Sequence, residues 1–88
     1  MVKLIKMAPL VADKNGIQIS IYFKEHLPPH FHATYAEDEV LIEIRSGKIY
    51  KGWIPPNKLK IVQKWLKEGE NRKRAEKIFF ELNPRLKK

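Results

Sequence analysis

The sequence predicts an α+β fold, in which an antiparallel sheet of about five strands is followed by two C-terminal helices packed on one face of the sheet. Two observations lead to this class. Apolar residues alternate with polar ones over much of residues 3–54, which is typical of strands with one buried face. After Pro55 and Pro56 the apolar period changes from 2 to 3.6, which is typical of amphipathic helices. The 88 residues suffice for one core, so we expect a single domain over residues 1–88.

The first two strands are predicted over residues 3–11 and 16–24. Ile17, Ile19 and Ile21 alternate with polar residues, so their side chains should face the core. Asn15 and Gly16 precede them, and Asn-Gly is a strong hairpin signal because both residues tolerate positive φ. We therefore expect these strands to pair antiparallel.

Three more strands are predicted over residues 29–36, 39–45 and 48–54. Phe31 and Ala33 should face the helices, which sends His30 and His32 to the opposite face. A turn at Glu37 and Asp38 would place His32 opposite Glu43 and His30 opposite Arg45. The next turn, at Ser46 and Gly47, would then bring Tyr50 beside Glu43.

Two helices are predicted over residues 56–68 and 71–82. The first shares an apolar face that includes Val62 and Trp65, and Gly69 is a typical stop after it. The second has Ala75 and Phe79 on one face and ends at Asn83-Pro84. Trp53 and Trp65 both fall at positions expected in the core.

The composition limits the cellular location and the kinds of metal site that we expect. The chain has no cysteine, which excludes disulfides and thiolate metal sites. It has no apolar run of about eighteen residues, and its first residues lack the long apolar stretch that is typical of a signal peptide. We therefore expect no membrane association and a cytoplasmic location. Histidine and carboxylate remain as metal ligands.

The positive charge is concentrated in the C-terminal third. Residues 57–88 contain eleven Lys or Arg against four Asp or Glu, whereas residues 1–56 contain seven against six. Arg72, Lys73 and Arg74 open the second helix, and Lys77 follows one turn later. These four residues are candidates for contact with nucleic-acid phosphates. The alternatives are an acidic protein partner and a solvated surface without a ligand.

All three histidines lie between residues 26 and 32, in the segment His-Leu-Pro-Pro-His-Phe-His. Two imidazoles on one strand face supply two metal ligands, so His26, His30 and His32 form a candidate site for zinc or another divalent ion. We do not favour the metal, because Pro28 and Pro29 should extend the chain between His26 and the other two histidines.

Two other interpretations of the histidines remain open. His30, His32 and Glu43 could act without a metal in general acid-base cleavage of RNA, which would make the protein a small nuclease or hydrolase. Alternatively, the histidines are structural residues that hydrogen-bond near the start of the strand and hold it in place.

Around Pro28-Pro29-His30-Phe31-His32-Ala33 the chain resembles a small prokaryotic family, the domain of unknown function numbered 4160. The resemblance also covers Phe23-Lys24-Glu25-His26, the strand from Val40, Ser46-Gly47-Lys48-Ile49 and Gly52-Trp53-Ile54-Pro55, and extends over about residues 15–70. It implies a small α+β domain but no activity. The gene neighbourhood of the family implies toxin-antitoxin or mobile-element modules.

Together, these features predict a non-enzymatic accessory module of a toxin-antitoxin-like or mobile-element operon. We expect it to bind nucleic acid or a small protein encoded by a neighbouring gene, and a homodimer is a further option. The alternative is the histidine-dependent hydrolase, with or without a metal.

Overall fold

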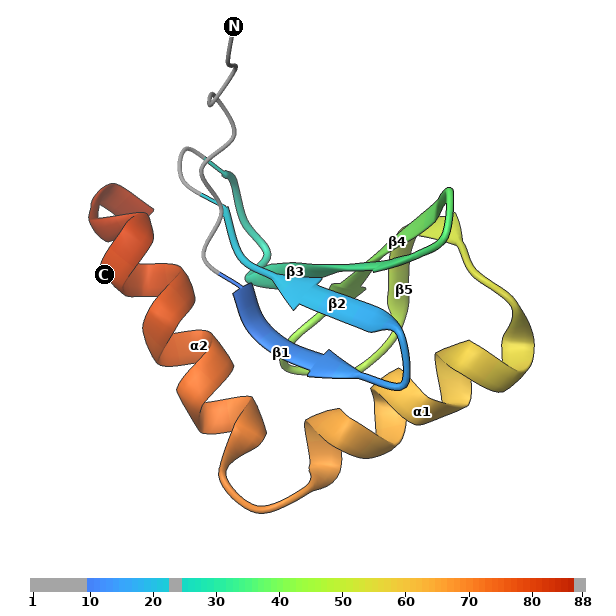
Figure 1. Ribbon diagram of the computed structural model, residues 1–88. Coiled ribbons are helices and arrows are strands. Elements are labelled where there is room, and N and C mark those ends of the chain that lie inside the picture. The colour runs from blue at the N-terminus through green and yellow to red at the C-terminus, as the bar shows by residue number, and fades with distance from the viewer. Residues whose placement is uncertain (1–9, 23–24, 87–88) are drawn as a thin grey trace, which may run out of the picture.

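The computed structural model describes residues 10–22 and 25–86, and over these residues it confirms the predicted α+β class (Figure 1). The strands are β1 (Leu10–Lys14), β2 (Ile17–Ser20), β3 (His30–Tyr35), β4 (Asp38–Glu43) and β5 (Ile49–Trp53). They are followed by α1 (Pro56–Lys67), α2 (Asn71–Leu82) and the short 3-10 helix η1 (Pro84–Leu86). The predicted strand residues 3–9 and 23–24 lie outside the described residues.

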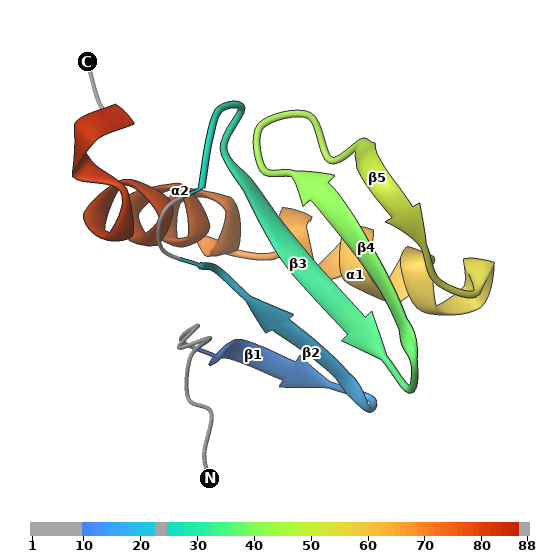
Figure 2. The ribbon, with the colours of Figure 1, turned by 90° about the horizontal axis from the view of Figure 1, so that it is seen from above.

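The five strands form one antiparallel sheet in chain order, with β1 and β5 at its edges. Both helices lie on the same side of this sheet. In Figure 1 α1 runs below the strands and α2 rises at their left, and in Figure 2, which is seen from above, the helices lie behind the sheet. No described helix covers the other face, which we call the open face. Neither helix is long and apolar enough to cross a membrane, as far as the described part of the chain goes.

The core lies between the sheet and the helices. Most of its side chains are at the positions that the period-two and period-3.6 patterns predict. Phe31 packs edge-on against Trp65, with ring centroids 5.7 Å apart. The buried apolar residues are Ile17, Ile19, Ile21, Phe31, Ala33, Val40, Ile42, Ile44, Ile54, Val62, Trp65, Leu66, Ala75 and Phe79.

Trp53 is not in the core, contrary to the prediction. Gly52 pairs with Val40 on the core side of the sheet, so its neighbour Trp53 turns to the open face beside Glu39, where it is 57% exposed. Gly52 has φ +87°, and a Cβ at this position would collide with the backbone of Glu39.

The hairpin between β3 and β4 turns one residue earlier than predicted. Ala36 has the positive φ that the turn requires, 54°, so Glu37 does not have to adopt this conformation. Phe31 therefore pairs with Ile42 rather than Ile44, and Glu43 lies opposite His30 rather than His32. Because the shift is two residues, every side chain keeps its predicted face.

The register of β5 also differs from the prediction. An irregularity in the pairing of β4 with β5 leaves Tyr50 between the pairs Leu41–Lys51 and Ile42–Ile49. Tyr50 is therefore not paired with Glu43. Its ring lies over His30 instead, with centroids 5.3 Å apart.

Candidate metal centre

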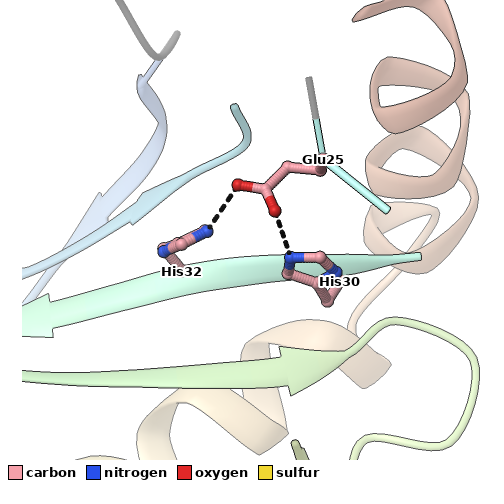
Figure 3. A group of neighbouring side chains, drawn as sticks. All are labelled: Glu25, His30 and His32. Carbon is pink, nitrogen blue, oxygen red and sulfur yellow. Dashed lines mark hydrogen bonds and ion pairs between the residues drawn. The ribbon is translucent and has the colours of Figure 1, made fainter. Parts of the chain in front are cut away.

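The two histidines of β3 meet the carboxylate of Glu25, a residue that the sequence analysis did not select as a site residue. Glu25 lies in the segment between β2 and β3 and reaches over the start of β3 (Figure 3). Its Oε1 is 3.0 Å from His30 Nε2, and its Oε2 is 3.3 Å from His32 Nε2. One carboxylate thus bridges the facing nitrogens of both rings.

The surroundings of the two rings differ. The His30 side chain is completely buried, with the rings of Tyr50 and Phe79 at centroid distances of 5.3 and 5.7 Å. His32 is half-buried and has the Tyr22 ring against it at 4.3 Å. The site is therefore enclosed on the side of His30 and more open on the side of His32.

The Nδ1 atom of each histidine faces an acceptor. His30 Nδ1 lies 2.8 Å from the carbonyl oxygen of Pro28, and His32 Nδ1 lies 2.9 Å from Oε2 of Glu39. A carbonyl and an ionised carboxylate only accept hydrogen bonds, so both Nδ1 atoms must donate. This places the proton of each neutral ring on Nδ1.

This assignment creates a conflict at Nε2. In a neutral ring whose Nδ1 is protonated, Nε2 carries a lone pair, and here both lone pairs face the acceptor oxygens of Glu25. Contacts this short between acceptors need a proton or a cation between them. Protons on Nε2 or on the Glu25 carboxyl are one solution, and a cation bound by all three groups is the other.

The arrangement fits a metal ion. Glu25, His30 and His32 each offer one ligand atom, and these atoms lie within 4.8 Å of one another. Tetrahedral ligands at about 2.0–2.2 Å from zinc are separated by about 3.3–3.6 Å. The contacts of 3.0 and 3.3 Å are near this range, and they involve the two different oxygens of Glu25. Histidines that bind metals usually donate their other ring N–H to a carbonyl or carboxylate, as Pro28 and Glu39 allow here.

Comparison with protein families places this site in a known group of sequences. The family described as "Domain of unknown function (DUF4160)" matches residues 16–76. The chain belongs to the DUF4160 family. This confirms the family that the resemblance indicated. No curated protein and no solved structure matches the chain.

Within this DUF4160 domain, the matched range includes the three candidate ligands and Glu39. The family description assigns no function to them. The one sequence signal that pointed to Glu25 was its place in Phe23-Lys24-Glu25-His26, where it carries the family resemblance. A contact between Glu25 and β3 cannot be read from spacing, because it depends on the path of the segment before β3.

Tyr22, whose ring lies against His32, has a phenol with a raised pKa. Burial raises the pKa of its phenol above the usual 10.0, and the nearby carboxylates of Glu39 and Glu25 raise the pKa further. The phenol therefore stays neutral in ordinary buffers.

The other predicted ligand and catalytic residues, His26 and Glu43, do not place ligand atoms in the cluster, although the His26 ring lies 5.7 Å from the His30 ring. His26 is exposed, and its Nδ1 lies 3.2 Å from the carbonyl oxygen of Leu27. It is not among the three residues whose ligand atoms converge. Glu43 accepts a hydrogen bond from Ser46 Oγ at 2.8 Å, because the register places it away from His32. Glu25 thus occupies the position expected of Glu43.

The four basic candidates of α2 do not converge on one point. Arg72 is half-buried and donates from Nε to the carbonyl oxygen of Ile44 at 3.0 Å. Lys73 and Lys77 lie near acids of their own helix region, at 3.6 Å from Glu70 and 3.7 Å from Glu81. Arg74 reaches the side chain of Asn71 at 3.5 Å.

Proposed function

We propose that this protein binds a divalent transition-metal ion through Glu25, His30 Nε2 and His32 Nε2, and that the ion serves a hydrolytic reaction. One observation carries the proposal. The two Nε2 lone pairs and the Glu25 carboxylate point at one another while both Nδ1 atoms are held by acceptors. A divalent ion removes this conflict at once, because each of the three groups can then donate a lone pair to it.

The donor set indicates the kind of metal and reaction. Two imidazoles with one carboxylate suit zinc, iron, cobalt or nickel better than magnesium or calcium, which prefer oxygen ligands alone. Three protein ligands leave a position for water, and a bound metal lowers the pKa of that water to about 7 in zinc hydrolases. The partial exposure of His32 and Glu25 favours access from the open face.

Phosphodiester cleavage is the hydrolytic reaction to assay first, because the chain carries a net charge of +8 and polyanions are attracted to such a surface. In this proposal Glu25 takes the place beside the histidines that the sequence analysis gave to Glu43, but as a metal ligand. The competing explanation of the site is two doubly protonated histidines around Glu25, with a purely structural role.

Metal titration separates these explanations. Metal-free wild-type protein is titrated with Zn²⁺ and Co²⁺ in a calorimeter, in two buffers of different ionisation enthalpy. We expect one ion per chain and release of protons, because the metal displaces any proton from Nε2. A protein that binds none of Zn²⁺, Co²⁺, Ni²⁺, Mn²⁺ or Fe²⁺ at micromolar concentration would contradict the proposal and favour the protonated pair. Phosphodiester cleavage that is abolished by His32→Ala would support the hydrolytic part.

A second candidate function is contact with nucleic acid through α2. Lys73 and Lys77 have side chains 82% and 76% exposed, so their ammonium groups can leave Glu70 and Glu81 for phosphates at little cost. Such contacts would suit the accessory role in a toxin-antitoxin-like operon that the resemblance implied. We expect binding to a duplex or RNA to weaken with salt and with Lys73→Glu/Lys77→Glu. Salt-independent binding would contradict this candidate.

A further inference from the structure

The segment that presents Glu25 is attached to the end of α2 by two side chains, Asn83 and Arg85. Asn83 Oδ1 accepts the backbone N–H of Glu25 at 2.8 Å. Arg85 Nη2 donates to the backbone carbonyl of Glu25 at 2.8 Å. Both hydrogen-bonding groups of the Glu25 backbone are therefore held by residues about sixty positions later in the chain.

Asn83 also forms hydrogen bonds with residues other than Glu25. It is fully buried, and its Nδ2 donates to the carbonyl oxygens of Tyr22 and Phe79, each at 3.0 Å. One amide side chain thus joins residues 22 and 25 to the last turn of α2 and uses both its donor and its acceptor. Such a bridge fixes the position of the segment relative to the helix.

The same end of α2 also contacts a second candidate ligand, because the Phe79 ring packs against His30 at 5.7 Å. Glu25 is the one candidate ligand that lies outside the strands, whereas His30 and His32 are held by β3. The position of Glu25 therefore depends on a contact between its own backbone and a distant element.

We infer that Asn83 and Arg85 are positioning residues of the metal centre, which aim the Glu25 carboxylate at His30 and His32. The inference rests on the proposed metal site and extends that site beyond the family match, which ends at residue 76. Neither residue contributes a ligand atom. Each acts through the backbone of Glu25, as outer partners of metal ligands do when they orient those ligands.

The test compares the Co²⁺-loaded full chain with its variants. We expect Asn83→Ala to weaken Co²⁺ binding about 10–100-fold, in the range found for outer partners of metal ligands. Arg85 is exposed, so Arg85→Ala should keep the fold and weaken binding about 3–10-fold, the lower part of that range. Both variants should also change the visible absorption of bound Co²⁺, because the spectrum reports the geometry of the ligands.

Two matched variants separate positioning from general stability. Ala75→Gly should destabilise α2 without touching Glu25, so its unfolding free energy should fall while its Co²⁺ affinity and spectrum stay as in the wild type. Arg74→Ala removes an exposed arginine of α2 whose side chain reaches Asn71, and it should change neither property.

The outcomes are distinguishable. If the wild type binds Co²⁺ and folded Arg85→Ala and Asn83→Ala keep its affinity and spectrum, the positioning role is wrong and the metal site stands. If the wild type binds no metal, both proposals fail. If Asn83→Ala does not fold, the comparison of Arg85→Ala with Arg74→Ala in Co²⁺ affinity and spectrum decides whether the positioning role is right.

Discussion

The Glu25–His30–His32 cluster and the basic first turns of α2 both collect ionisable side chains over a short stretch of sequence, yet only the cluster brings them to one point. The three groups of the cluster place ligand atoms within 4.8 Å of one another and are largely shielded from water. The cations of α2 each have a separate partner, such as Ile44 for Arg72 and Glu81 for Lys77. The comparison teaches that convergence and desolvation, rather than local density of charge, distinguish a candidate site from a solvated surface.

The largest expected effect concerns Glu25. Glu25→Gln removes a charged ligand, so we expect the dissociation constant for Zn²⁺ to rise about 100-fold or more, since losing an outer partner alone costs 10–100-fold. The amide can still donate to one Nε2, so the metal-free fold should persist. Competition with a zinc chelator measures the affinity, and circular dichroism checks the fold.

The matched control in α2 is Lys73→Gln, a substitution at an exposed charge outside the cluster. It should leave zinc affinity unchanged within about twofold, because screening by solvent makes exposed charges interact weakly over distance. Equal losses in the two variants would mean that general electrostatics, and not the cluster, governs binding.

The next effect concerns Glu39, which holds Nδ1 of His32. Glu39→Gln weakens this outer contact, and we expect zinc affinity to fall about 10–100-fold with the stoichiometry unchanged. Zinc titration followed by calorimetry measures both quantities. An unchanged affinity would show that His32 needs no orientation by Glu39.

A smaller effect is expected for the stability contributed by α2 cations. Lys77→Ala should change the unfolding free energy by no more than about 0.5 kcal/mol, because an exposed pair four residues apart on a helix contributes little. Urea unfolding of the metal-free protein tests this. A loss above about 1 kcal/mol would show that Lys77 has a structural partner stronger than Glu81.

The smallest effect concerns Tyr22 at high pH. Its pKa is raised in the folded protein above the 10.0 of an unperturbed phenol, so the folded state binds this proton more tightly than the unfolded state. The resulting stability is fully present below pH 10 and is lost as the pH rises through the folded pKa. Tyr22→Phe should therefore lose less stability than the wild type between pH 8 and pH 10.5, measured by urea unfolding with a chelator present. An identical loss in both proteins would contradict the raised pKa.

Much of the fold could be predicted from local patterns. The Asn15-Gly16 turn, the alternation of the isoleucines in β2 and the change of period at Pro55 depend on neighbours in sequence, so they survive without tertiary information. The predicted register of β3 with β4 was wrong by two residues, because the register depends on which residue of the turn between them has a positive φ. Trp53 was misplaced because Gly52, which pairs with Val40, takes the helix-facing side of β5 and leaves Trp53 on the other side.

The candidate site was predicted in part. His30 and His32 share one side of β3, as strand alternation requires, but their carboxylate partners are Glu25 and Glu39 rather than Glu43. Glu43 was selected through a register that the β3–β4 turn does not adopt. His26 was selected for its residue type, yet its ligand atoms do not join those of the other two histidines.

The sequence by itself determined the α+β class, the order of the elements, most of the core residues and the pair of histidines on one strand face. These follow from periodicity and turn chemistry, which act between residues close in the chain. Only the tertiary structure decided which carboxylate meets the histidines, because Glu25 is positioned by Asn83 and Arg85 from the far end of the chain. Contacts of this kind depend on how helices pack beside a sheet, and no local pattern of residues encodes them.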